Sequence, residues 1–195
     1  MSLKTETPML THTDLQRIRD MAIGQTVVDG TDIYLVKFAF GTMTTRDEDQ
    51  SVTDSPLVMY ELYIRDPLRE ASVEHIGGVQ FALMHDRETH STTARIFNAT
   101  IDREWRGRGL GKFLYKGAIN DLFEAGLAEC VQSDLIRSVD AERVWQSICR
   151  TSPGKVYPRG MRMGSRGHIY ETRGPAPILR RPGPVRVRGH ARRRR

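Results

Sequence analysis

One stretch decides the fold of this chain: NATIDREWRGRGLGKFL, residues 98–114. Its first four residues close a run of β-branched and apolar side chains, 94–101, that predicts a strand. Gly107, Gly109 and Gly111 follow within a short basic turn, and apolar residues at helical spacing come after them. A helix N-terminus presents unpaired backbone N–H groups and partial positive charge, and glycines let a phosphate approach that backbone closely. The order strand, glycine-rich turn, helix therefore predicts a phosphate-binding loop.

Three known phosphate loops can be compared with this turn. A Walker A loop needs Ser or Thr after its lysine, but a phenylalanine follows Lys112. A dinucleotide-binding fingerprint needs GxGxxG after an early strand, and the spacing of Gly107, Gly109 and Gly111 does not give it. The third pattern, [Gln/Arg]-x-x-Gly-x-[Gly/Ala], is matched at each defined position from Arg106 onward. On these residues alone, a basic turn with a purely structural role remains the alternative.

Hydrophobic periodicity predicts the elements around the turn. Before it we expect a helix from a capping box at Thr13 to Gly24, four strands (32–40, 57–65, 76–84 and 94–101), and a polar loop over 42–55. After it we expect a helix over 111–125, a buried strand over 127–131, a helix over 138–149, and two closing strands at 156–163 and 169–172. The first three strands follow one another without a long helix between them, which indicates an antiparallel meander.

Charge and composition divide the chain at residue 174. The segment 174–195 holds eight arginines and no acidic residue, which leaves 22 basic and 24 acidic residues in 1–173. The formal charge of +6 therefore comes from the tail, and 1–173 carries about −2. A Pro-, Gly- and Arg-rich tail buries too little apolar surface to offset its ordering entropy. We expect one domain over 1–173 and a disordered basic tail over 174–195.

Cysteine usage and hydropathy limit the class of protein. Cys130 and Cys149 form no CxxC or Cys/His cluster, so we expect no metal site and two reduced thiols. No apolar run approaches the ~20 residues that span a bilayer. We expect a soluble protein of the cytoplasm with no membrane partner.

The stretch 98–114 resembles the signature of the GNAT family of N-acetyltransferases, in which a strand, an aromatic residue and a glycine loop precede a helix. The resemblance implies an α+β fold: a mixed, mostly antiparallel sheet of six to seven strands, flanked by helices, with two central strands that splay apart. It implies acetyl-CoA as co-substrate, with its pyrophosphate on the loop backbone and its pantetheine arm against the preceding strand. A polar residue at the start of the last helix contacts the arm in this family, or simply caps the helix. The positions of this chain that match these roles are Ala99, Thr100, Ile101, Arg106, Gly107, Arg108, Gly109, Leu110, Gly111, Lys112 and Ser138.

The chain departs from the family pattern at the catalytic positions. Where many members have a tyrosine that protonates the leaving thiolate, this chain has Trp145, which we expect in the core. Many members also have a glutamate on a splayed strand, and strand 94–101 has no carboxylate. Asp134, just after the next strand, is the candidate base or acceptor-orienting residue. Tyr157 and His168 are the other side chains that we weigh for proton transfer.

Three functions remain open from the sequence. The first is an acetyl-CoA-dependent N-acetyltransferase that acts on an amine-bearing small molecule or protein by direct attack in a ternary complex. The second is a catalytically weak GNAT-fold protein with a binding or structural role, in a nucleic-acid or viral particle for example. The third is a protein whose main function is nonspecific nucleic-acid contact through the arginine-rich tail. A net acidic loop, 46–49, is a candidate attractor for a cationic acceptor.

Overall fold

The structure is a computed structural model that describes residues 14–46, 52–65, 73–86, 88–134, 137–151, 154–158 and 168–174. Its elements, in chain order, are α1 Asp14–Met21, β1 Ala22–Val28, β2 Thr31–Arg46, β3 Val52–Arg65, β4 Val73–His85, β5 Thr92–Ile101, the 3-10 turn η1 Arg103–Trp105, α2 Leu110–Glu124, β6 Cys130–Gln132, α3 Val139–Thr151, β7 Gly154–Pro158 and β8 His168–Arg173. In this described part, no helix is both long enough and apolar enough to cross a membrane.

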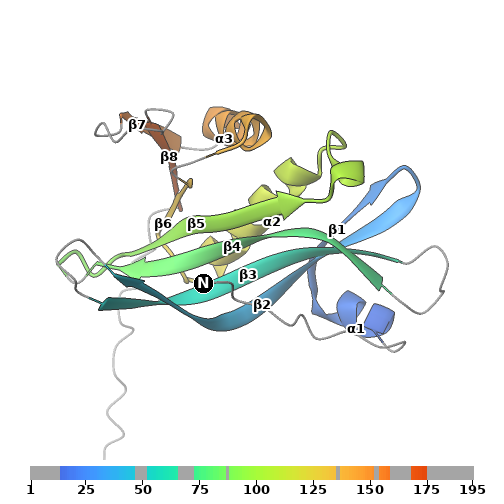
Figure 1. The fold of residues 1–195 in the computed structure, drawn as a ribbon, viewed down its shortest axis with the longest axis horizontal. Coiled ribbons are helices and arrows are strands. Elements are labelled where there is room, and N and C mark those ends of the chain that lie inside the picture. The colour runs from blue at the N-terminus through green and yellow to red at the C-terminus, as the bar shows by residue number, and fades with distance from the viewer. Residues whose placement is uncertain are drawn as a thin grey trace, which may run out of the picture.

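One sheet of eight strands organises the described chain, in the order β1-β2-β3-β4-β5-β6-β8-β7. All neighbouring strands are antiparallel except β5 and β6, which are parallel. Helices α2 and α3 lie on one face of the sheet and α1 on the other (Figure 1). The predicted α+β fold with a mixed, mostly antiparallel sheet is confirmed.

The sheet has one more strand than the sequence predicted, because β1 was assigned in part to the first helix. That helix ends at Met21 rather than at Gly24, and β1 begins directly after it. Of the three large apolar side chains of β1, Val28 packs against the core, but Ile23 and Val27 point outward and are 41% and 60% exposed. An apolar side chain on the solvent face inverts the alternation that identifies a half-buried strand.

The hairpin of β2 and β3 is also longer than expected. The first and last residues of the predicted loop, 42–55, belong to the β2–β3 ladder instead, where Thr44 pairs with Asp54. The Thr44 hydroxyl donates a hydrogen bond of 2.6 Å to the Asp54 carboxylate. Cross-strand polar pairs of this kind stabilise a sheet without any apolar alternation. Residues 47–51, with most of the acidic segment 46–49, lie outside the described residues.

Each face of the sheet has its own apolar cluster. The larger one joins the sheet to α2 and α3 and includes Tyr60, Leu62 and Trp145. The smaller one joins α1 to the opposite face and includes Val36 and Tyr63. Neighbouring residues of a strand therefore face different helices, as the two-residue period of a strand requires.

The strands β5 and β6 separate after a short contact, as the sequence predicted. Their parallel ladder has three pairs and ends where Arg95 meets Gln132. Beyond it, the β4–β5 register shifts between Ile96 and Asn98, so Phe97 is the extra residue of a β-bulge. Residues 98–100 are exposed. Within the part of the chain that the structure describes, no strand pairs with the second half of β5 on the side of α3, so this edge is free there.

Candidate functional site

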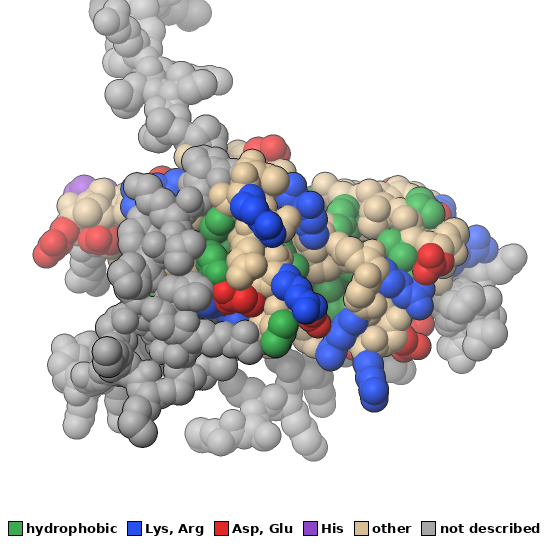
Figure 2. All heavy atoms as spheres, turned by 90° about the horizontal axis from the view of Figure 1, so that it is seen from above, with side chains coloured by type: hydrophobic (Ala, Val, Ile, Leu, Met, Phe, Trp, Pro, Cys, Tyr) green, Lys and Arg blue, Asp and Glu red, His purple; other side chains and the backbone are tan. Residues whose placement is uncertain are grey.

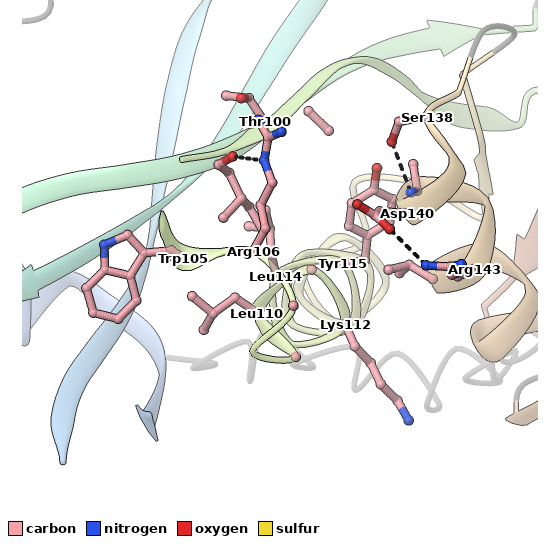
Figure 3. Close-up of a pocket in the computed structure, with 17 residues that line it drawn as sticks. Thr100, Trp105, Arg106, Leu110, Lys112, Leu114, Tyr115, Ser138, Asp140 and Arg143 are labelled. Atoms are coloured by element: carbon pink, nitrogen blue, oxygen red, sulfur yellow. Dashed lines mark hydrogen bonds and ion pairs between the residues drawn. The ribbon is translucent and has the colours of Figure 1, made fainter. Parts of the chain in front are cut away.

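A pocket of about 460 Å³ lies between the free edge of β5, the N-terminus of α2 and the N-terminus of α3. This volume falls in the usual range of small-molecule sites, roughly 300–1,000 Å³. Ten of the eleven residues that the sequence assigned to donor binding line it, and only Arg108 does not. Figure 3 shows how these residues surround the pocket from three separate elements. The lining residues are Ala99, Thr100, Ile101, Trp105, Arg106, Gly107, Gly109, Leu110, Gly111, Lys112, Leu114, Tyr115, Ser138, Asp140, Ala141, Arg143 and Val144.

The glycines of the turn have the backbone conformation that the loop needs. Gly107 and Gly109 have φ angles of 77° and 83°, in the left-handed region that side chains disfavour. Gly109 is the N-cap of α2, and none of the described side chains caps this helix end. A Cβ added at Gly107 or Gly109 would meet nothing within 4 Å. The helix therefore presents open backbone at its positive end, where an anion is favoured.

The basic residues of the turn differ in their roles. The Arg106 Nε donates to the Ile101 carbonyl at 2.7 Å, so this side chain fastens the turn to the end of β5 (Figure 3). Arg108 forms an ion pair of 2.5 Å with Asp29, and its guanidinium lies 5.0 Å from the centre of the Trp105 ring. Asp29 lies in the turn between β1 and β2, so Arg108 connects that hairpin to the loop.

Lys112 contributes to the site differently from the glycines before it. Its backbone N–H already donates to the Gly109 carbonyl at 3.1 Å. Its side chain is exposed and points away from Thr100 and Ser138 in Figure 3. The exposed ammonium group of Lys112, rather than its amide, is therefore available to an anion at this end of the pocket. Besides Lys112, other Lys and Arg side chains are exposed on the face of the molecule that Figure 2 shows from above.

The opposite wall of the pocket is the first turn of α3. The Ser138 hydroxyl accepts a hydrogen bond of 3.2 Å from the Ala141 N–H, so Ser138 caps this helix as well as lining the pocket. Asp140 and Arg143 form an exposed ion pair of 3.2 Å one turn apart. The capping role predicted for Ser138 is observed, and its position in the pocket lining is compatible with the predicted contact to a pantetheine arm, which stays a prediction.

A buried polar cluster holds this wall against the sheet. The Arg137 guanidinium, almost fully buried, pairs with Glu142 at 2.9 Å and donates to the Ser133 hydroxyl at 3.0 Å. Tyr170 of β8 donates its hydroxyl to Glu142, and Arg137 lies 5.0 Å from the centre of the Tyr170 ring. Buried polar groups that satisfy one another in this way fix one arrangement of the chain. The cluster therefore sets the position of α3 relative to β6 and β8.

Tyr115 is a pocket residue that the sequence analysis missed. It lies on α2, is 5% exposed and lines the pocket with Ser138. Burial, and next the charge of Asp134, raise the pKa of its hydroxyl to about 12, against an opposing effect of Arg137. The side chain is therefore protonated at neutral pH. The available signal was its spacing of one helical turn from Gly111, which places both on the same side of α2.

Trp145 and Asp134 are two of the positions that the sequence analysis discussed for catalysis. Trp145 is fully buried, stacked on Tyr170 with ring centres 6.2 Å apart, and absent from the pocket lining. It belongs to the core, as predicted. Asp134 lies at the end of β6 and is also outside the pocket lining, with its backbone carbonyl accepting from Arg137 at 2.5 Å. Its predicted role as base stays a prediction.

Four other tyrosines and histidines are divided between the two faces of the sheet and the surface. Tyr60 faces α2, where its hydroxyl donates to Asp121 at 2.7 Å, whereas Tyr63 packs on the α1 face. His85 and His90 are exposed. The side chains of Tyr157 and His168 lie outside the described part of the structure.

Comparisons with known proteins find one matching family and a set of solved structures with low sequence identity to this chain. The family model described as Acetyltransferase (GNAT) family matches residues 44–143. No curated protein matches the chain. Solved structures that match include Arabidopsis thaliana NAA60 in complex with a bisubstrate analogue, which is 17% identical with a TM-score of 0.42 and covers 60% of this chain and 73% of that one. The ribosomal-protein-S18-alanine N-acetyltransferase from Escherichia coli is 15% identical with a TM-score of 0.39, and the match covers 61% of this chain and 72% of that one.

Proposed function

The chain belongs to the acetyltransferase (GNAT) family, and on this premise we propose that it transfers the acetyl group of acetyl-CoA to an amine acceptor by direct attack in a ternary complex. The observation that carries the proposal is the open N-terminus of α2 beside the free edge of β5. One pocket contains both features.

The residues of the pocket suit the parts of acetyl-CoA. In the proposal, the amides around Gly107, Gly109 and Gly111 hold the pyrophosphate, since no side chain caps the helix there. Thr100 and its neighbours on the free edge pair with the amide groups of the pantetheine arm, as an added strand would. Ser138 lies across the pocket and contacts the arm from the other side.

The co-substrate supplies a thioester, and this chain's residues orient it and stabilise its charges. The ammonium of the acceptor first gives one proton to solvent water, and the neutral nitrogen attacks the thioester carbonyl carbon to form a tetrahedral oxyanion. The carbonyl then re-forms as the C–S bond breaks, CoA leaves as a thiolate, and the second amine proton passes to water or to that thiolate. In the proposal, a β5 backbone N–H at the free edge donates a hydrogen bond to the developing oxyanion.

Tyr115 is the pocket side chain that we assign to the thiolate. Its pKa of about 12 lies above that of a free thiol, roughly 8.5, so outright proton transfer from the phenol is unfavourable. The hydroxyl instead donates a hydrogen bond that stabilises the thiolate as the C–S bond breaks. This role replaces the family tyrosine at the position of Trp145, which is buried in the core.

Calorimetry and turnover together test the proposal. Acetyl-CoA and CoA are expected to bind the full chain with similar affinity, because the loop recognises the diphosphate that both share. Free thiol should then appear only when an amine is added. Absence of acetyl-CoA binding would refute the proposal.

A second function stays open because of one observation. Asp140 is the only carboxylate that lines the pocket among the described residues, and it is already paired with Arg143. A catalytically weak binding protein would have this appearance. Tight acetyl-CoA binding without turnover of polyamines, aminoglycosides or peptides would favour that alternative over the first.

A further inference from the structure

We infer that Glu61, with Tyr63 and His75, binds a second cationic group of the acceptor, so that the acceptor class is a diamine or polyamine. The inference rests on the proposed function for the identity of the reaction. Its own basis is a buried carboxylate on the face of the sheet opposite α2.

The cluster is formed by adjacent strands. Glu61 lies on β3 and is only 8% exposed, and its carboxylate accepts a hydrogen bond from the Tyr63 hydroxyl. The imidazole Nε2 of His75, on β4, lies 3.8 Å from the other carboxylate oxygen. The rings of Tyr63 and His75 meet edge to face with centres 5.5 Å apart. The carboxylate is thus held in place by two neutral or weakly basic groups.

No permanent cation balances Glu61 among the described residues. Lys37 lies on the neighbouring strand β2, but it pairs with Asp121 at 2.6 Å on the α2 side of the sheet. A carboxylate removed from water is costly unless a positive charge compensates it. It can also accept more hydrogen bonds than the one from Tyr63. A ligand ammonium would supply both the charge and the missing donors.

In the register of the sheet, only a glycine stands between Glu61 of this cluster and Thr100 of the pocket. Glu61 is paired with Gly78 on β4, and Gly78 is paired with Thr100, which lines the pocket. A Cβ at Gly78 would lie 2.7 Å from the Tyr60 carbonyl oxygen, and one at Gly77 would lie 2.5 Å from the Thr100 carbonyl oxygen. No side chain therefore stands between Glu61 and Thr100 in this row.

The spacing of the strands sets the length of the acceptor. Glu61 and Thr100 are two strands apart, and neighbouring strands are about 4.8 Å apart, so the two positions are roughly 10 Å apart. A nitrogen that attacks at the edge of β5 therefore cannot be the group bound by Glu61. An acceptor with two amines separated by about six carbons can reach both positions at once.

Direct binding tests the inference without requiring turnover. The full chain is titrated calorimetrically with 1,6-diaminohexane, with hexylamine and 1,3-diaminopropane as ligands that carry one amine or too short a span. We expect the long diamine to bind best, and Glu61→Gln to weaken it ten-fold or more. Glu74→Gln is the matched control, because Glu74 is exposed on β4 and the change removes the same charge. Equal binding of 1,6-diaminohexane by wild type and Glu61→Gln would overturn the inference.

Kinetics and folding controls separate this inference from the proposed function. In acetyl transfer, the preference for 1,6-diaminohexane over hexylamine in kcat/KM should fall toward one in Glu61→Gln and persist in Glu74→Gln. Acetyl-CoA binding with no diamine preference in wild type would overturn the inference alone. Diamine binding that depends on Glu61 without acetyl-CoA binding would overturn the proposed function alone. The unfolding temperatures of Glu61→Gln and Tyr63→Phe are measured as well. They check that a loss of diamine binding comes from the altered cluster and not from an unfolded protein.

Discussion

A charge placed at the N-cap of α2 should have opposite effects on stability and on donor binding. Gly109 has φ 83° and ψ −3°, and a side chain there extends into open space. Gly109→Glu and Gly109→Gln share the cost of a left-handed backbone, about 1–2 kcal/mol, and have nearly the same shape. They differ in one negative charge at the positive end of the helix. The pair therefore isolates electrostatics from strain.

The size of each effect follows from that geometry. A glutamate at a helix N-terminus is more stabilising than a neutral residue by about 0.3–1 kcal/mol. The same carboxylate, about 5 Å from a bound diphosphate, repels each unit of its charge by about 3 kcal/mol at an effective dielectric constant near 20, before screening by salt. We therefore expect Gly109→Glu to melt at or above the temperature of Gly109→Gln, yet to bind acetyl-CoA at least about ten-fold more weakly.

Calorimetric titration and thermal unfolding of the two variants, in the same buffer, provide the assay. The repulsion should shrink as salt is raised, because the loop is exposed. Equal acetyl-CoA affinity of the two variants at low salt would refute the reasoning, since the diphosphate would then lie elsewhere.

Three further predictions concern the surroundings of the pocket. Asp29→Asn should strengthen acetyl-CoA binding a few-fold at low salt, since it frees Arg108 from its ion pair; calorimetry that shows weaker binding would contradict this. Trp145→Phe should lower the unfolding temperature and leave acetyl-CoA affinity within about two-fold, because Trp145 packs between Tyr115 and Tyr170 outside the pocket; a selective loss of affinity would argue for a direct role. Burial and Glu171 raise the pKa of the Cys130 thiol to about 12, so this thiol should resist iodoacetamide in the folded protein at pH 9, where a thiol of ordinary pKa reacts. The contribution of the protonated thiol to stability is complete below pH 9 and is lost as pH rises toward 12. Rapid alkylation of Cys130 in the native protein would refute both statements.

The sequence predicted the glycine loop that forms one side of the pocket because its signals are local. The strand end at Ile101, the left-handed glycines and the start of α2 follow one another along the chain, and each has a backbone reason to be there. Ser138 was named through the family resemblance, and its capping of α3 was predicted from a local pattern as well.

The remaining features depend on contacts between distant residues. Tyr115 reads as one more residue of an amphipathic helix until α3 places the pocket beside it. Glu61 and His75 meet only through the β3–β4 register, whose bulge at Ile76 is not visible in the sequence pattern. The boundary of the domain at residue 173 and the disorder of the tail stay predictions.

The most direct test of the central claim is a titration of isotope-labelled protein with acetyl-CoA, followed by amide proton–nitrogen NMR spectra. Saturable shifts should be largest at the amides of Gly107, Gly109 and Gly111 and along Ala99–Ile101, and CoA should reproduce those at the glycines. Unchanged glycine amides at saturation, or shifts confined to another part of the molecule, would contradict the assignment of this loop to the diphosphate.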